Sequence, residues 1–127
     1  MIYAFEQEQL DKTEDILEKN LIENGVKSAI VLDMAGHIIA SCKSKECTHD
    51  IHSLAALAAG NFGAVDAMAK IVGEEFSLLF HKGEGENLHF SKINEELLLI
   101  TTFGNEVSLG FLRMKINESI NVMRGIF

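Results

Sequence analysis

The sequence predicts an α+β domain built on a single five-stranded antiparallel sheet with helices on both faces. Three observations predict this class. Residues 28–33 and 96–103 are apolar on both faces, which is typical of central strands covered from two sides. Short turns connect successive strand segments, so neighbouring strands should run antiparallel. Helical periodicity recurs near the start, in the middle and at the end of the chain.

Composition favours one domain spanning residues 1–127. The chain has 127 residues, 47% of them hydrophobic, and no proline, which is enough for a single core. The net charge of −8 argues against nucleic-acid partners and anionic membranes, because both need a basic patch.

The chain shows no targeting signal that we recognise. Its first residues lack a basic segment followed by an apolar one, so we expect no signal peptide. The least polar stretch is interrupted by His52, Ser53 and Asn61, and we expect it to be too short and too rich in small residues to span a bilayer. The two cysteines are interpreted as free thiols in a reducing compartment. A cytoplasmic protein is therefore predicted.

The first half of the chain begins with an amphipathic helix over residues 6–24, ended by Asn24 and Gly25. Its acidic outer face is interpreted as a solvated surface. A strand over residues 28–33 and a second strand over 37–42 should form a hairpin, with Gly36 supplying the positive φ of the turn.

The second half alternates in the same way. A long helix over residues 50–72 is followed by strands over 76–81 and 87–93, joined by a glycine-rich turn. A central strand over 96–103 and a last helix over 106–124 complete the order.

The long middle helix is apolar on more sides than a surface helix needs. We expect its large side chains to pack on the sheet: Leu54, Leu57, Val65, Met68 and Val72. The other side carries only small residues and is predicted to bind a partner: Ala55, Ala56, Ala59, Gly60, Gly63 and Ala67. The alternative is that these small residues pack on the chain's own sheet or on a sister helix.

Five motifs in this order resemble the Roadblock (dynein light chain) family, and within it the MglB-like bacterial and archaeal members. They are Ala29–Asp33 with the turn to Gly36, residues 37–41, Leu54–Gly60, Glu96–Ile100 and Ser108–Arg113. The resemblance implies that the first and last helices share one sheet face, while the middle helix covers the other. It also implies dimers in which middle helices pair and third strands join two sheets.

The resemblance suggests residues for the dimer interface: Leu57, Asn61, Phe62, Val65, Phe76, Leu78 and Phe80. Asn61 is interpreted either as a polar residue that fixes helix register or as a locally bonded rim residue. The implied function is regulation of a Ras-like small GTPase by docking, without catalytic groups. A dimeric scaffold or adaptor and a small-ligand or metal sensor are the alternatives.

Two groups of histidines and cysteines are candidate metal sites. Cys42, Cys47, His49 and His52 have suitable ligand types but loose spacing and no second ligand pair, so free thiols are favoured. His81 and His89 lie on the two strands that the glycine-rich turn joins and could face each other, although a solvent-facing position is favoured. No metal or other cofactor is predicted.

Catalytic motifs are missing from the sequence. We find no nucleophile elbow, and the turn at Gly83–Glu86 lacks the lysine and hydroxyl residues of a phosphate loop. Nothing nearby supports an arginine-finger role for Arg113 or Arg124. The chain is therefore predicted not to be an enzyme.

Overall fold

The structure, a computed structural model, describes residues 5–76 and 78–127. In chain order the elements are α1 (Gln7–Ile16), a π-helical segment η1 (Leu17–Leu21), a 3₁₀ segment η2 (Ile22–Asn24), β1 (Val26–Asp33), β2 (Ile38–Lys43), α2 (Ile51–Val72), β3 (Leu78–Lys82), β4 (Glu86–Lys92), β5 (Leu97–Gly104) and α3 (Leu109–Ile126).

The five strands form one sheet in the order β2-β1-β5-β4-β3, and every pairing is antiparallel. The two segments predicted as central, β1 and β5, pair with each other in the middle. All residues of β5 are buried, as expected for a strand that is apolar on both faces. The predicted fold class is confirmed, and β3 and β2 are the two edges.

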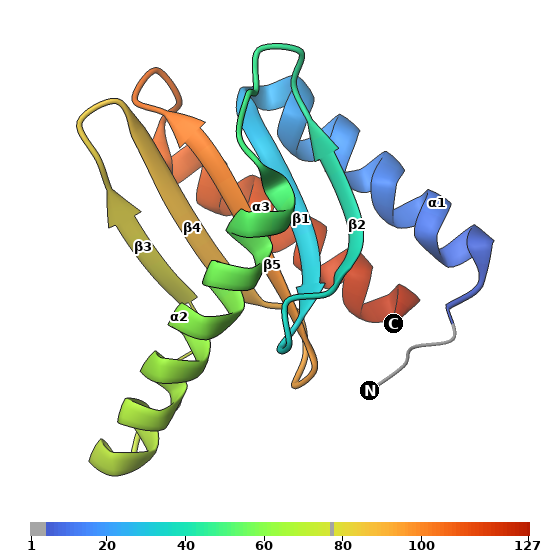
Figure 1. Ribbon diagram of the computed structural model, residues 1–127. Coiled ribbons are helices and arrows are strands. Elements are labelled where there is room, and N and C mark those ends of the chain that lie inside the picture. The colour runs from blue at the N-terminus through green and yellow to red at the C-terminus, as the bar shows by residue number, and fades with distance from the viewer. Residues whose placement is uncertain (1–4, 77) are drawn as a thin grey trace.

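Helices cover both sheet faces, as Figure 1 shows: α1 and α3 lie behind the sheet and α2 crosses its front. Each face has its own core. Behind the sheet, Leu17, Leu21, Leu112 and Ile116 pack on the inward side chains of β1 and β5. In front, Phe62 of α2 packs with its neighbours on Ile30, Leu32, Leu98 and Ile100.

The predicted helix over residues 6–24 is not a uniform α-helix. It widens into the π-helical segment and tightens into the 3₁₀ segment before Gly25, which has φ 102° and ends it. Leu17 and Leu21 are fully buried in this part of the chain.

Some of the small residues of α2 face the sheet, which reverses part of the prediction. The buried residues of α2 are Ala55, Ala58, Ala59, Phe62 and Ala69. Leu57, Met68 and Val72, which we expected against the sheet, are exposed. Small side chains let the helix axis lie close to a sheet face already filled by large aliphatic residues, so Phe62 is the one large side chain of α2 that is fully buried there.

Both ends of α2 carry specific caps. The side chain of Asp50 accepts hydrogen bonds from the N–H groups of His52 and Ser53, and Gly73, with φ 76°, closes the helix. The helix has 22 residues and is apolar enough to cross a membrane by length and composition alone. Our expectation that this stretch is too short was therefore wrong as to length, but one such helix is weak evidence of a membrane span, because buried core helices pass the same test.

Candidate interaction surface

The outer face of α2 exposes large apolar side chains at both ends. Leu57 is 73% exposed near the N-terminal end, and Ile71 is 85% exposed near the C-terminal end, where Met68 and Val72 are also exposed. In Figure 1 the C-terminal turns of α2 project past the sheet. Exposed apolar groups along one side of a helix are typical of a protein-binding surface.

Small residues separate these two ends. Gly60, Gly63, Ala64 and Ala67 are exposed, and a β-carbon added at Gly60 or Gly63 would meet nothing within 4 Å. Another backbone could therefore approach this part of α2 closely. We call the exposed side of α2, with Leu57, Gly60, Gly63, Ala64, Ala67, Met68, Ile71 and Val72, the outer α2 face.

The predicted partner-binding residues divide into two groups. Ala56, Gly60, Gly63 and Ala67 are exposed. Ala55 and Ala59 are 0% and 5% exposed because they pack on the sheet, so they are not accessible to a partner in this structure. The expectation that the whole small-residue side faces outward is thus wrong for these two residues.

An apolar groove runs between α2 and the sheet. One cavity of about 420 Å³ is lined by Leu54, Leu57, Ala58, Asn61, His81, Leu88 and Phe90. A second, of about 290 Å³, is lined by His49, Asp50, Leu54, Leu57, Glu86, Leu88 and Thr102. Because the two cavities share Leu54, Leu57 and Leu88, they form one groove beside the exposed Leu57.

The predicted dimer-interface residues lie in different environments. Leu57 and Asn61 are exposed and line the groove, Phe76 is exposed, and Val65 is half-buried. Phe62 is only 2% exposed, so its side chain belongs to the core and not to an accessible surface.

The remaining two interface predictions fall on β3, at the edge of the sheet. Phe80 is half-buried and stacks on Phe103, with a ring-centroid distance of 6.2 Å. Leu78 begins the strand, but its side chain lies outside the described residues.

His81 and His89 lie on opposite faces of the sheet, because Phe80, and not His81, is the direct partner of His89. His81 lines the groove. His89 is 2% exposed, so the favoured solvent-facing position is wrong for it. Its Nδ1 lies 3.2 Å from the Ser91 hydroxyl, and its Nε2 has no hydrogen-bond partner among the described residues.

The electrostatic setting of His89 keeps its ring neutral. Burial, with a smaller contribution from the positive charge of Arg113, lowers the pKa of His89 to about 4.

The string of cysteines and histidines does not converge on one point. Within residues 5–76 and 78–127, no group of three or more His, Cys, Asp and Glu side chains could hold a metal ion. The Cys42 thiol donates to the carbonyl oxygen of Glu14, and His52 is exposed in the first turn of α2. Cys47 and His49, however, contact each other, with 3.5 Å between Sγ and Nδ1.

His49 also belongs to a charged network that sequence patterns did not reveal. Its Nε2 lies 2.8 Å from Oε2 of Glu86, and Oε1 of Glu86 lies 2.8 Å from Nζ of Lys27. The hydrogen bond from Lys27, together with His49, holds the pKa of Glu86 below its usual value against the opposing effect of partial burial. Lys27 and Glu86 are far apart in sequence, so only the sheet brings them together.

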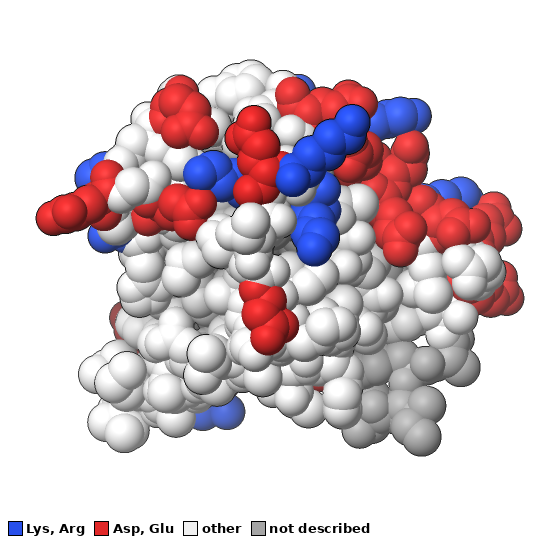
Figure 2. Space-filling view, turned by 45° about the horizontal axis from the view of Figure 1, so that its top comes forward, with Lys and Arg blue, Asp and Glu red and all other residues white. Residues whose placement is uncertain are grey.

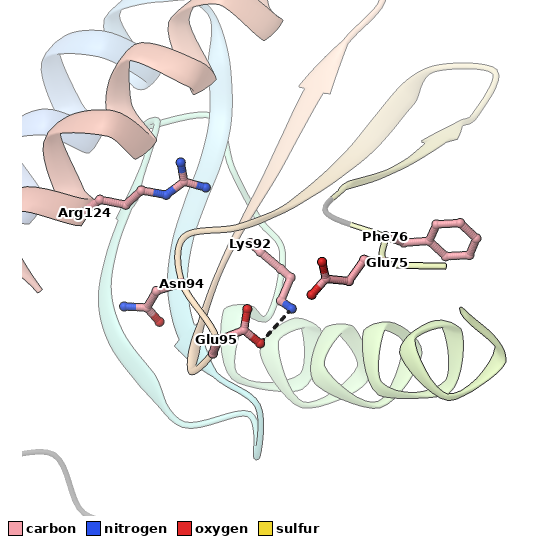
Figure 3. Close-up of a pocket in the computed structure, with 6 residues that line it drawn as sticks. All are labelled: Glu75, Phe76, Lys92, Asn94, Glu95 and Arg124. Carbon is pink, nitrogen blue, oxygen red and sulfur yellow. Dashed lines mark hydrogen bonds and ion pairs between the residues drawn. The ribbon is translucent and has the colours of Figure 1, made fainter. Parts of the chain in front are cut away.

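A separate polar pocket of about 280 Å³ lies beyond the end of β4. Figure 3 shows Lys92 bonded to Glu95, Glu75 pointing toward Lys92, and Phe76 pointing away. Arg124 donates from Nε to the carbonyl oxygen of Ile93 at 2.6 Å. This arginine therefore supports the protein's own fold at the rim of the pocket.

Charge is distributed unevenly over the surface. Figure 2 shows acidic and basic side chains gathered in a band across the upper part of the molecule, while the lower part is largely uncharged. The projecting end of α2 lies on this less charged side. An apolar partner surface would suit it better than a strongly basic one.

The fold and this surface define a small sheet domain with an exposed central helix, a class known from the Roadblock and profilin folds. The sequence matches the Roadblock/LC7 domain over residues 12–103, and the chain belongs to this family. A comparison with curated proteins finds no match.

Solved structures show the same relationship in more detail. MglB of Myxococcus xanthus is 29% identical, with a TM-score of 0.90 over 99% of this chain and 94% of that chain. Gliding protein MglB of Thermus thermophilus is 26% identical, with a TM-score of 0.87 over 99% of this chain and 93% of that chain. The predicted resemblance to MglB-like proteins is confirmed.

A profilin of Acanthamoeba castellanii shares the fold alone. It is 14% identical, with a TM-score of 0.61 over 88% of this chain and 96% of that chain.

Proposed function

We propose that the protein is a non-catalytic, dimeric regulator of a Ras-like small GTPase. The observation that carries this proposal is the outer α2 face, which exposes Leu57, Met68, Ile71 and Val72 in a chain similar to MglB over nearly its whole length. The resemblance to MglB-like regulators indicates the class of protein that binds. The exposed apolar side chains indicate where it binds.

Dimerisation would bury much of this exposed surface. Two copies of α2 can pack closely where Gly60, Ala64 and Ala67 leave their axes free to approach. The edge strand β3 offers unpaired backbone groups to the same strand of a second copy, and such pairing would protect an edge prone to aggregation. Both contacts suit a two-fold dimer, in which each surface meets its own copy.

The GTPase would bind the surface that remains on the paired α2 helices, including Ala56 and Gly63. No side chain of the regulator has to enter the reaction. Docking that favours one conformation of the GTPase switch segments shifts their populations, and this changes the hydrolysis or exchange rate.

The test combines the purified protein with each Ras-like small GTPase encoded in the same genome. Phosphate release and nucleotide exchange are measured with and without the protein, and its mass in solution is measured by light scattering. We expect a dimer that changes one of these rates for one GTPase. Unchanged rates and no binding across that set would contradict the proposal.

Two variants should affect dimerisation or docking without affecting the fold. Leu57→Asp and Gly63→Arg should leave the fold intact, because Leu57 is 73% exposed and a β-carbon at Gly63 meets nothing within 4 Å. Each should weaken dimerisation or GTPase binding. Met114→Asp is the control, since Met114 is 50% exposed on α3, behind the sheet, and should alter neither.

The second candidate function is a dimeric scaffold or adaptor. The open groove beside Leu57 favours it, because a peptide of another protein could lie there without any GTPase. A scaffold would dimerise and bind partners while leaving every GTPase rate unchanged.

A further inference from the structure

We propose that Cys47 is a reactive thiol that His49 activates for exchange with low-molecular-weight disulfides, making it a site of reversible covalent modification. This inference does not rest on the proposed regulatory function. It starts from the contact between Sγ of Cys47 and Nδ1 of His49, 3.5 Å apart, in the loop between β2 and α2.

The two residues have the arrangement that an activated nucleophile needs: a thiol, a base beside it and a third group that orients the base. Glu86 is the third group, at 2.8 Å from the other ring nitrogen of His49. Its carboxylate would stabilise the imidazolium that forms when His49 takes the thiol proton. Lys27, at 2.8 Å from Glu86, holds that carboxylate in place.

Three separate parts of the fold maintain this arrangement. Lys27 comes from β1, Glu86 from the start of β4, and His49 from the loop before α2. The loop is also tied to β1, because the N–H of Ser44 donates to the carbonyl oxygen of Lys27 at 2.7 Å and the N–H of Cys47 donates to that of Ser44 at 3.1 Å. The pairing of Cys47 and His49 is therefore set by tertiary structure and not only by their proximity in sequence.

The exchange reaction balances without a further reactant. Cys47 gives its proton to His49, and the thiolate attacks one sulfur of the small disulfide. A new disulfide bond forms on Cys47 as the old one breaks, and the leaving thiolate takes the proton back from His49. The product is a mixed disulfide on Cys47 and one molecule of free small thiol.

Cys47 is 8% exposed, so a reagent can reach its Sγ only if the loop moves while His49 stays beside the thiol. The end of the apolar groove, lined by His49 and Glu86, lies beside the loop.

Cys42, the second cysteine, is an internal control for the reactivity of Cys47. Burial, with smaller contributions from Glu18 and Glu14, raises the pKa of the Cys42 thiol to about 11. Cys42 has no histidine beside it among the described residues and donates instead to the carbonyl oxygen of Glu14. It should react slowly with the same reagents.

The experiment uses the full chain and glutathione disulfide at neutral pH. Adducts on each cysteine are counted over time by mass spectrometry of the intact protein and its peptides. We expect Cys47 to react at least about a hundredfold faster than Cys42, given the usual size of base catalysis. His49→Gln should slow Cys47 by about a hundredfold or more, while His52→Gln, which changes an exposed neighbour, should leave its rate unchanged.

Two results would overturn the inference: equal rates for the two cysteines, or an unchanged Cys47 rate in His49→Gln. Thermal unfolding of each variant is followed alongside. If His49→Gln loosens the fold, Cys42 becomes faster as well, so the ratio of the two rates separates loss of activation from general opening. A ratio that stays at the value of the unmodified protein in this variant also overturns the inference.

Discussion

Gly36 packs against the backbone of Ala56, so close that a β-carbon on Gly36 would lie 3.0 Å from Cα of Ala56. This contact joins the β1–β2 turn to the first turns of α2. Gly36 also has φ 92°, in the left-handed region that disfavours other residues. Glycine at position 36 therefore meets two requirements, the positive φ of the turn and the close approach to Ala56. Only the first could be predicted from the sequence.

Replacing Gly36 with alanine should destabilise the protein by about 2 kcal/mol or more, because left-handed strain and a backbone contact act together. The free energy of unfolding in urea measures this. Gly85→Ala is the matched control, since a β-carbon there meets nothing within 4 Å and Gly85 is not among the positive-φ glycines. It should change stability by less than about 0.5 kcal/mol. Equal effects of the two changes would contradict this account of the turn.

Phe62 and Leu57 should respond very differently to truncation, although both lie on α2. Phe62→Ala removes the large side chain that fills the space between α2 and the sheet, and should cost about 3–5 kcal/mol. Leu57→Ala should cost less than about 0.5 kcal/mol in the monomer, because Leu57 is 73% exposed. Urea titrations at low protein concentration measure both. A large loss in the monomer for Leu57→Ala would mean that the outer α2 face is internal.

Phe62 and Leu57 also show which features of the fold could be predicted from the sequence and which could not. Runs that are apolar on both faces, such as residues 96–103, identified the central strands, and turn glycines identified the hairpins. Periodicity located α2 but not its orientation, because both of its sides are apolar and either could face the sheet. The choice depended on how large the side chains of β1 and β5 are, which is a property of the packed sheet.

The candidate sites also differ in how much of each could be predicted from the sequence. The exposure of small residues on the outer α2 face was predicted in part, since Gly60, Gly63 and Ala67 are exposed. The network of Lys27, Glu86 and His49 was not predicted, because its members come from three segments far apart in sequence. Only the pairing of strands brings such residues together.

Asp33 should stabilise the β1–β2 turn through its buried carboxylate. Its Oδ1 accepts hydrogen bonds from the N–H groups of Ala35 and His37 at 3.0 and 2.9 Å, and its Oδ2 lies 2.9 Å from Nδ1 of His37. Burial raises the pKa of Asp33, but the hydrogen bonds outweigh it and hold the pKa below its usual value. The carboxylate form is therefore the one that the fold favours.

Asp33→Ala should cost about 2–3 kcal/mol at pH 7, since it removes the hydrogen bonds that a charged carboxylate accepts in the turn. Asp33→Asn keeps one acceptor oxygen and should cost about half as much. Because the folded pKa is lowered, the contribution of Asp33 is present above its unfolded pKa and is lost as the pH falls through the folded one. Urea titrations at pH 7 and pH 3 measure both effects, and equal losses in the two variants would contradict the role of the turn bonds.

His89 should make the protein less stable in mild acid. Its pKa is about 4 in the folded chain against an unperturbed value of 6.5, so the unfolded chain binds a proton first as the pH falls. Its titration leaves stability unchanged above pH 6.5, lowers stability as the pH falls from 6.5 to 4, and changes it little below that. The full loss is about 3 kcal/mol.

The measurement that isolates this effect compares the free energy of unfolding at pH 7.5, 5.5 and 4.0 in the protein and in His89→Gln. The variant removes the titrating group, so its stability should fall less over this range, by about 3 kcal/mol in total. His52→Gln changes an exposed histidine and should keep the full decline. Other groups, such as Asp33, titrate alike in all three proteins, so the difference between the curves belongs to residue 89. Parallel curves for the protein and His89→Gln would show that the buried imidazole finds a partner that stabilises its charged form.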